Sequence, residues 1–267
     1  MPKVRVGDIE LNYERAGAGE PLLLIQGMSA NHMAWGRPFR SLLEEQFEVI
    51  VFDNRGMGLS SRVSEQFSTA EMAADTAGLL DALGVESAHV LGISMGGMIA
   101  QELALAHPER LRSLTIGCSY CGGEGSALMD PADFQGLVEA MGSGNQDRVF
   151  EAMYSLNLSP GFRAEASRFA GFTEMAAALP APRETIGLQL QAIVAHNTNS
   201  RLPNLRIPTL VIHGAVDRVL PALNGHLIAS LIPGSQLEIY DEVGHMFWWE
   251  QPERTAELVR EHALAVA

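Results

Sequence analysis

The sequence predicts an α/β protein in which helices flank a mostly parallel sheet of eight strands, with one helical segment inserted. Short apolar runs alternate with stretches of helical period up to residue 121, and the alternation resumes after residue 204. Between these parts, residues 122–204 contain stretches of helical period but no apolar run typical of a buried strand. We therefore expect a core formed by residues 1–121 and 205–267, and a helical cap formed by residues 122–204.

The expected strands differ between the start of the chain and the rest. Residues 4–9 and 10–15 alternate apolar and polar side chains and predict a hairpin around Gly7 and Asp8. Most later runs are almost continuously apolar, as expected of parallel strands that are covered on both faces. These later strands comprise residues 21–25, 47–52, 88–93, 111–117, 207–213 and 236–240.

Helix signals separate the strands. Ser68 and Glu71 have the spacing of a capping box and predict a helix that ends at Gly84. A second helix over residues 95–107 is ended by Pro108. Two further core helices are expected near residues 221–231 and from about residue 251, and the cap helices near residues 131–141, 146–156, 163–178 and 182–196.

The composition excludes several classes of protein. Of the 267 residues, 47% are hydrophobic and 19% are charged, which allows a sizeable core and rules out a wholly disordered chain. The 32 acidic residues outnumber the 18 Lys and Arg residues, and the net charge of −14 disfavours nucleic acid or an anionic membrane as a partner. Neither a signal peptide nor a long apolar segment is visible, so we expect a cytoplasmic protein. A homo-oligomer is compatible with the sequence.

No cofactor or metal is expected. Cys118 and Cys121 form a C-x-x-C pair, but the pair closes an apolar run and enters a Gly-rich loop, unlike the redox motif that opens a helix. No second such pair and no H-x-x-x-H cluster supplies further metal ligands. No G-x-G-x-x-G follows the first strands, which excludes a dinucleotide-binding oxidoreductase.

The clearest sign of chemistry lies where the expected strand 88–93 meets the following helix. The sequence from Gly92 to Gly97, GISMGG, matches G-x-S-x-G between a strand and a helix. A serine on such a strained turn exposes its Oγ, and glycines two residues before and after it relieve the crowding. Ser94 is therefore the candidate nucleophile, and the alternative is an ordinary strand–helix turn that starts with a serine.

These residues resemble the α/β-hydrolase superfamily, and the resemblance covers nearly the whole chain. GISMGG resembles the nucleophile elbow, and the chain order Ser94, Asp217, His245 is the order that this superfamily uses. The resemblance implies a serine hydrolase of the esterase or lactonase branch with a helical cap. Other similar segments are residues 26–28 at the oxyanion loop, 53–60 at a D-x-R-G-x-G-x-S turn, 211–217 at the acid and 243–245 at the base.

A serine hydroxyl needs a base that takes its proton and an acid that orients the base. His245 follows the last expected strand by a short loop, which places its imidazole at the same edge of the sheet as Ser94. His196, at the end of an expected cap helix, is the alternative base. Asp217 follows the preceding strand at its carboxyl end and is the candidate acid, with Asp241 as its rival.

The oxyanion hole is expected from the backbone N–H groups of Met28 and Met95. Gln26 stands where the superfamily usually carries a histidine, and we expect its side chain to support the loop. That departure from the usual histidine bears on which shape of substrate fits the site more than on the mechanism. Asp53 and Arg55 could form a charged catalytic pair, but the resemblance implies that their turn is structural.

The expected pocket is apolar. Trp35, Phe247 and Trp248 come from loops near the candidate nucleophile and are the candidate lining residues, and an apolar lining favours uncharged acyl or alkyl groups. Four cap arginines stand among acidic residues, so we expect them to be solvated rather than to bind a substrate carboxylate. They are Arg148, Arg163, Arg168 and Arg183.

Together these features predict a serine hydrolase that cleaves carboxylic ester or lactone bonds of small hydrophobic substrates through an acyl-enzyme. Alternatives on the same fold are an enol-lactonase or carbon–carbon bond hydrolase of aromatic degradation, a cofactor-free perhydrolase, or a non-catalytic ligand receptor. Haloalkane dehalogenases and epoxide hydrolases of this fold carry Asp at the elbow, so Ser94 disfavours both.

Overall fold

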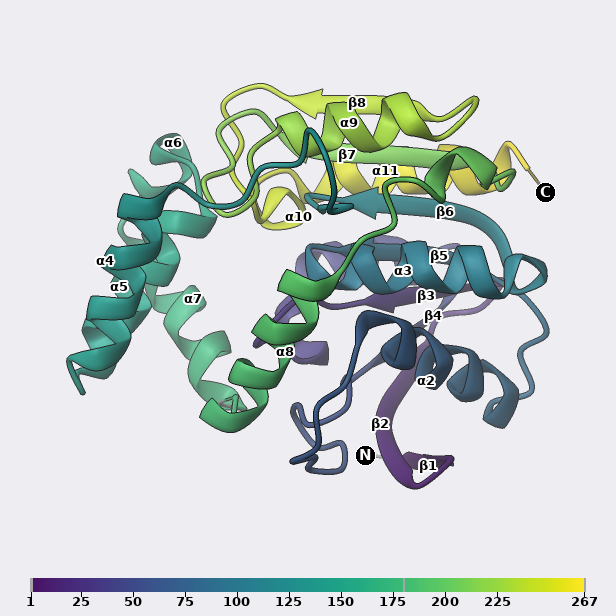
Figure 1. Cartoon of the computed structure of the whole chain (residues 1–267), viewed down its shortest axis with the longest axis horizontal. Coiled ribbons are helices and arrows are strands. Elements are labelled where there is room, and N and C mark those ends of the chain that lie inside the picture. Colours follow the sequence, from purple (N-terminus) through teal and green to yellow (C-terminus); the bar gives the residue numbers. More distant parts are fainter. Residues whose placement is uncertain (1, 180, 267) are drawn as a thin grey trace.

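The computed structural model describes residues 2–179 and 181–266, and these contain one eight-stranded sheet with helices on both faces (Figure 1). The strands are β1 (Lys3–Val6), β2 (Ile9–Ala16), β3 (Glu20–Ile25), β4 (Phe47–Phe52), β5 (Ala88–Ile93), β6 (Leu111–Gly117), β7 (Thr209–Gly214) and β8 (Gln236–Tyr240). Their order in the sheet is β1-β2-β4-β3-β5-β6-β7-β8. Only the pairs β1–β2 and β2–β4 are antiparallel. The predicted α/β fold with a mostly parallel, eight-stranded sheet is confirmed.

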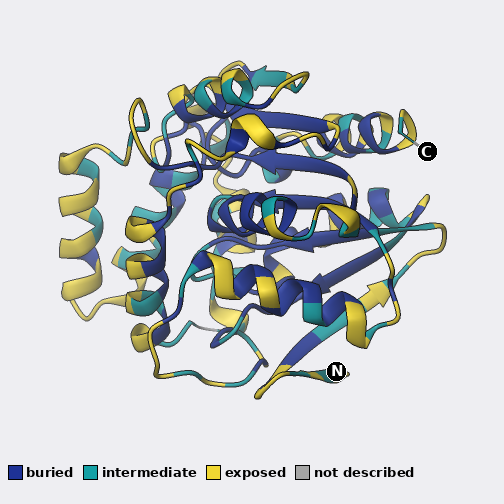
Figure 2. Ribbon diagram, turned by 45° about the vertical axis from the view of Figure 1, so that its right-hand side comes forward, coloured by how far each residue is buried: buried dark blue, intermediate teal, exposed yellow. Residues whose placement is uncertain are grey.

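Helices cover both faces of the sheet because the central strands are apolar on both sides. One hydrophobic cluster packs α1 (Arg37–Glu44) and α11 (Pro252–Leu264) on one face. The other packs α2 (Thr69–Ala82), α3 (Met95–Ala106) and α9 (Leu223–Leu231) on the opposite face. The central strands are accordingly dark blue, the colour of buried residues, in Figure 2.

The apolar run of β3 shows how one strand serves both layers. Leu22 and Leu24 belong to the cluster of α1 and α11, whereas Leu23 and Ile25 belong to the cluster of α2 and α3. Successive side chains of a strand point to opposite faces, so a strand between two helical layers must be apolar at every position. This is the physical reason why the sequence shows continuous apolar runs here.

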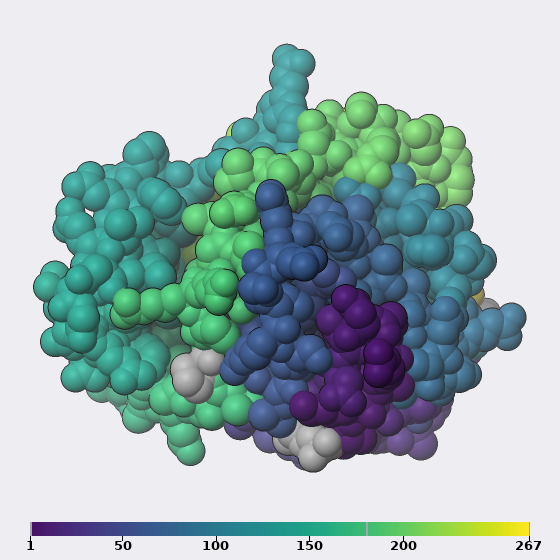
Figure 3. Space-filling view, turned by 60° about the horizontal axis from the view of Figure 1, so that its bottom comes forward, coloured from purple at the N-terminus to yellow at the C-terminus, as the bar shows by residue number. Residues whose placement is uncertain are grey.

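Among the described residues, five α-helices lie between β6 and β7 in the chain, in the segment that we interpret as the cap. They are α4 (Pro131–Gly142), α5 (Gln146–Asn157), α6 (Pro160–Arg163), α7 (Ser167–Ala178) and α8 (Arg183–Ala195). In Figure 1 the arrows of β6 and β8 point towards them, so they stand at the carboxyl edge of the sheet. Figure 3 shows much of this segment, teal and green, on the left of the visible face, and the purple N-terminal hairpin in its lower middle.

Several element boundaries differ from the prediction. The turn at Gly7 is present with a φ of 57°, but β1 already ends at Val6 and β2 starts only at Ile9. Helix α1 was not predicted, although Phe39 and Leu43, four residues apart, both face the core. Among the described residues, no helix is both long enough and apolar enough to cross a membrane.

The junction between β5 and α3 depends on close backbone packing. A Cβ at Gly96 would lie 2.0 Å from the carbonyl oxygen of Ile25, and a Cβ at Gly92 would lie 2.3 Å from the carbonyl oxygen of Gly96. Both distances are far below van der Waals contact, so only glycine fits at these two positions. The first turn of α3 can therefore press against the end of β3, which brings the loop after β3 next to the residue that precedes α3.

We expect Gly96→Ala to lower the free energy of unfolding by about 3 kcal/mol, because the new methyl group would displace backbone rather than a flexible side chain. The matched control is Gly187→Ala in α8, where a Cβ would meet no atom within 4 Å. That change should raise stability by about 0.5–1 kcal/mol, since alanine restricts the unfolded chain. Urea unfolding of both variants measures the difference, and equal stabilities would contradict the packing argument.

Candidate active site

Ser94 occupies the strained turn between β5 and α3. Its φ of 54° and ψ of −124° lie in a region that non-glycine residues rarely adopt. It stands at the N-cap position of α3, yet its side chain makes no capping hydrogen bond. Its backbone is fixed on both sides, because its N–H donates to Gly117 O (2.9 Å) and its carbonyl accepts from Ser119 Oγ (2.8 Å). The strain is thus held by the sheet, and the partly exposed Oγ is left for other chemistry.

Asp217 and His245 form a short hydrogen bond beside this turn. The Nδ1 of His245 lies 2.7 Å from Asp217 Oδ2, and both side chains are buried. Asp217 Oδ1 accepts from the N–H groups of Val219 (2.8 Å) and Leu220 (2.9 Å). His213 Nε2 lies 3.2 Å from the same Oδ2 that His245 contacts. A carboxylate with these donors is oriented on both of its oxygens.

Burial by itself would raise the pKa of Asp217, but the nearby imidazoles outweigh it. The charge of His245, with the hydrogen bonds from His213 and His245, lowers the pKa of Asp217 to about 2. The acid is therefore ionised at neutral pH and accepts a hydrogen bond from the Nδ1–H of His245. This leaves Nε2 as the basic nitrogen of that ring, which is the tautomer that a general base requires.

Cys118 lies between the strand that leads to Ser94 and the strand that leads to Asp217. It directly follows β6, its thiol is fully buried, and its backbone N–H donates to Ile212 O of β7 at 2.8 Å. Its pKa is raised well above the ordinary value, first by burial and then by the negative charge of Asp217. Both cysteines are free and buried, and in the described part of the chain no three His, Cys, Asp or Glu side chains group as metal ligands.

The loop after β3 runs directly over Ser94. A Cβ at Gly27 would lie 3.0 Å from Ser94 Cβ and 3.4 Å from its Oγ, which is tighter than ordinary van der Waals contact, so the loop passes very close to the serine side chain. Gln26 Oε1 accepts from Gly27 N–H (3.2 Å), so this side chain supports the loop. In the hydrogen bonds of the described residues, the N–H groups of Met28 and Met95 have no protein acceptor, as donors to an oxyanion require.

Sequence reasoning missed one contact to this loop. Ser29, with a φ of 60°, donates its N–H to Gln189 Oε1 at 2.9 Å, and Gln189 is a fully buried residue of α8. A cap helix therefore holds the loop that carries Met28. The two residues are 160 positions apart, and no local pattern around Gln189 distinguishes it from other polar helix residues.

Trp35, Phe247 and Trp248, which we expected to line the pocket, are buried and pack against other residues of the core. Trp35 and Phe247 are 0% exposed and Trp248 is 3% exposed. Trp248 packs against Trp35 and Phe247, with ring centroids 5.7 Å and 5.5 Å apart, and donates to Ala34 O. Their rings therefore support the segment just after His245 from the sheet side, and Trp35 and Phe247 present no free surface to a substrate.

The rival acid and the rival base lie in other environments. Asp241 is exposed, and the partner of the His245 ring is Asp217. His196 is buried between Thr69 Oγ1 (2.9 Å from Nδ1) and Thr198 Oγ1 (3.4 Å from Nε2). Burial, only partly offset by the charge of Glu102, lowers the pKa of His196 to about 4. His196 therefore joins the end of the cap to α2 as a neutral, structural imidazole.

The charged turn after β4 is also structural. Asp53 accepts from the N–H groups of His32 (2.8 Å) and Leu59 (2.9 Å), which fixes the turn to a neighbouring loop. Arg55 makes a bidentate ion pair with Asp75 of α2, at 2.5 Å and 2.7 Å. Both groups are thus fully engaged, as the resemblance implied.

Comparison with known proteins places the fold in a family. A model of the alpha/beta hydrolase fold matches residues 20–252. The chain belongs to the α/β hydrolase family. The family and fold predicted from the sequence are confirmed, and the relatives of the chain include hydrolases of several kinds.

Two curated relatives match this α/β hydrolase over nearly its full length. It is 34% identical over 249 residues to a protein of Azorhizobium caulinodans called "Putative carbamate hydrolase RutD", covering 92% of both chains. It is 33% identical over 273 residues to 2-hydroxymuconate semialdehyde hydrolase of Pseudomonas putida, covering 96% of this chain and 91% of that protein. A solved thermophilic esterase from Thermogutta terrifontis is 28% identical, with a TM-score of 0.82 over 99% of this chain and 98% of the esterase.

The assignment of the acid predicts different effects for two aspartates. Asp217→Asn should slow the reaction of Ser94 with a fluorophosphonate on the order of a thousandfold, because the amide favours the wrong tautomer of His245. Asp241→Asn is the matched control and should change this rate less than about threefold, since Asp241 is solvated. Labelling rates measured by mass spectrometry test this, and the reverse order would make Asp241 the acid.

The depressed pKa of His196 predicts a loss of stability in mild acid. Between the ordinary value of 6.5 and about 4, the unfolded chain binds a proton that the folded protein does not. The free energy of unfolding therefore has its full value, as far as His196 is concerned, above pH 6.5. It decreases as the pH falls towards 4, by roughly 3 kcal/mol for this one group. His196→Gln should flatten unfolding free energy against pH in this window, whereas His226→Gln, at an exposed site, should not. An unchanged slope in His196→Gln would contradict the argument.

Proposed function

We propose that this protein hydrolyses carboxylic ester or lactone bonds of small, uncharged, hydrophobic substrates through an acyl-enzyme on Ser94. The observation that carries the proposal is the bond of 2.7 Å between His245 and the buried carboxylate of Asp217, at the sheet edge that also presents Ser94 on its strained turn. In this arrangement the acid is ionised, the base is oriented, and the Ser94 hydroxyl makes no hydrogen bond with the part of the chain that the structure describes. This is what nucleophilic catalysis by serine needs.

In the proposed reaction, an acyl-enzyme forms on Ser94 and is then hydrolysed, and His245 accepts and returns a proton in both steps. Ser94 Oγ attacks the carbonyl carbon while His245 Nε2 accepts its proton, and Asp217 stabilises the imidazolium that forms. The negative charge that develops on the carbonyl oxygen is met by the N–H groups of Met28 and Met95. His245 then protonates the leaving alcohol. A water molecule, deprotonated by His245, cleaves the acyl-enzyme and restores Ser94.

The charges of the cap support an uncharged substrate. Arg148, Arg168 and Arg183 are exposed, and Arg168 pairs with Glu165. The half-buried Arg163 donates to Leu158 O at 3.1 Å. Each has water or a neighbour as its partner, so a substrate carboxylate buried below the cap would lack a cation, at a cost of several kcal/mol. The net charge of −14 adds a repulsive long-range field.

A second candidate is hydrolysis of a carbon–carbon bond in a ring-fission product. It is favoured by the 33% identity to a 2-hydroxymuconate semialdehyde hydrolase over 96% of this chain. The same serine, base and oxyanion donors serve both reactions. The two proposals differ in substrate charge, because a ring-fission product of this kind carries a carboxylate.

A matched pair of substrates separates the two proposals. The pair consists of one substrate that carries a free carboxylate and the same substrate with that carboxyl group masked as a neutral methyl ester. We expect the neutral form to be cleaved with a kcat/KM at least about tenfold higher, because the carboxylate of the acid form must be desolvated without a cation. Steady-state kinetics with wild type and with Ser94→Ala measure this, and the Ser94→Ala variant should lose nearly all turnover while remaining folded. A preference for the acid would favour carbon–carbon hydrolysis, and a Ser94→Ala rate within tenfold of wild type would contradict both proposals.

A further inference from the structure

The loop that carries His245 is attached to the cap on both sides of that residue. Gly244 N–H donates to Glu250 Oε1 at 2.9 Å, and the same oxygen accepts from Ser159 N–H, also at 2.9 Å. Met246 N–H donates to Asn157 O at 2.9 Å. The residues before and after the base are therefore both bonded, directly or through one carboxylate, to the junction between α5 and α6.

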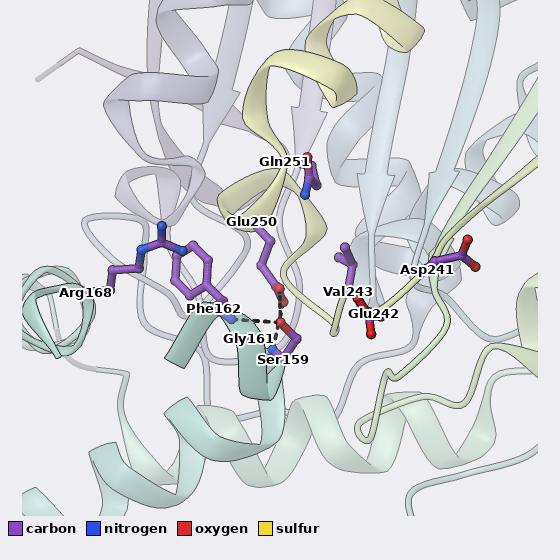
Figure 4. Close-up of a pocket in the computed structure, with 9 residues that line it drawn as sticks. All are labelled: Ser159, Gly161, Phe162, Arg168, Asp241, Glu242, Val243, Glu250 and Gln251. Atoms are coloured by element: carbon purple, nitrogen blue, oxygen red, sulfur yellow. Dashed lines mark hydrogen bonds between the residues drawn. The ribbon is translucent and has the colours of Figure 1, made fainter. Parts of the chain in front are cut away.

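Glu250 is the centre of this arrangement. It is the last residue of α10 (Phe247–Glu250), and its second oxygen accepts from Ser159 Oγ. Figure 4 shows Glu250 and Ser159 facing each other across these bonds, while Arg168 lies beside the ring of Phe162, away from the carboxylate. One side chain thus meets three donors, and two of them are backbone N–H groups whose positions fix the path of the chain.

The packing around Gly244 leaves the loop little freedom. A Cβ there would lie 2.9 Å from Asn157 O, 3.0 Å from Ser159 N and 3.1 Å from Glu250 Oε1. On the other side, a Cβ at Gly214, at the end of β7, would lie 2.2 Å from Gly244 O. The loop is therefore confined between the core and the cap. Glu250 forms part of the wall of a surface cavity of about 340 Å³, so water can compete for the donors if the carboxylate is removed.

We propose that Glu250 is a positioning residue for the base: it fixes His245 by bonding the loop to the cap, so that the seating of the cap sets the geometry of the His245–Asp217 pair. The inference rests on the proposed function, in which His245 is the base. Among the hydrogen bonds of the described residues, Glu250 bonds neither Ser94 nor the ring of His245, so it acts on the base through the backbone at Gly244.

Three variants test whether Glu250 acts by positioning the His245 loop or by its negative charge. Glu250→Ala removes all three acceptor contacts. Glu250→Gln keeps one oxygen that can accept from Gly244 and Ser159 N–H, and its amide N–H can donate to Ser159 Oγ, so the geometry survives without the charge. Glu253→Ala is the matched control, because Glu253 is an exposed carboxylate in the first turn of α11.

The first measurement is kcat per active site, with sites counted by fluorophosphonate titration so that unfolded protein is excluded. We expect a loss of about ten- to a hundredfold in Glu250→Ala, since a displacement of the base of about 1 Å has effects of this size. Glu250→Gln should stay within about threefold of wild type, as should Glu253→Ala. KM should change less than kcat in every variant. If Glu250→Ala does not fold, Glu250→Asp, which keeps the charge but shortens the reach, should show the loss instead.

The second measurement does not depend on turnover. The proton shared by His245 Nδ1 and Asp217 should give a far-downfield proton NMR signal, assigned by its absence in His245→Ala. We expect the signal to be lost or shifted in Glu250→Ala and kept in Glu250→Gln. If wild type hydrolyses no ester, the proposed function fails while this signal still tests the positioning. Full kcat per site with an unchanged signal in Glu250→Ala would overturn the inference, as would an equal loss in Glu250→Gln, which would make the charge rather than the position decisive.

Discussion

The buried, ionised carboxylate of Asp217 is the constraint on which the site depends. Burying an unpaired ion costs several kcal/mol, so the structure must supply donors to both oxygens. It does so with the backbone N–H groups of Val219 and Leu220 on one oxygen and with the imidazole of His245 on the other. His213 Nε2, which is hydrogen-bonded to Leu220 O, lies 3.2 Å from that second oxygen. The loop after β7 must therefore bend back on itself, and the loop after β8 must bring a histidine to the same point. The tautomer of the base follows from this arrangement rather than from the histidine alone.

The cap takes part in the same geometry. Gln189 of α8 holds the oxyanion loop at Ser29, and the α5–α6 junction holds the His245 loop through Glu250. On α4, Asp133 pairs with Arg218, the neighbour of Asp217. The loops after β3, β7 and β8 thus each have a partner in the inserted segment. A cap that closes over substrate in this way would set the orientation of the oxyanion donors and the base while it excludes water, which couples binding to chemistry.

Selection among substrates in such a site depends on which protein groups contact the substrate after its water of hydration is removed. The charged groups of the molecule are committed elsewhere: Arg55 to Asp75, Asp53 to its turn, and the cap arginines to solvent or to neighbours. The similar proteins are named a putative carbamate hydrolase, a 2-hydroxymuconate semialdehyde hydrolase and an esterase, so the fold by itself does not fix the substrate. In this chain the residues around the site offer little compensation for a buried negative charge.

The sequence alone determined the approximate positions of the strands and the strand–turn–helix context of Ser94, because apolar periodicity and a crowded glycine turn are local properties. It could not separate Asp217 from Asp241, since both follow strands near the base; only the folded loop, with its N–H groups aimed at one of them, decides. It also missed Gln189 and Glu250, whose partners lie 160 and 91 residues away. Hydrogen bonds between distant segments leave no periodic signal in a single chain, so tertiary packing alone decided which polar residues hold the catalytic loops.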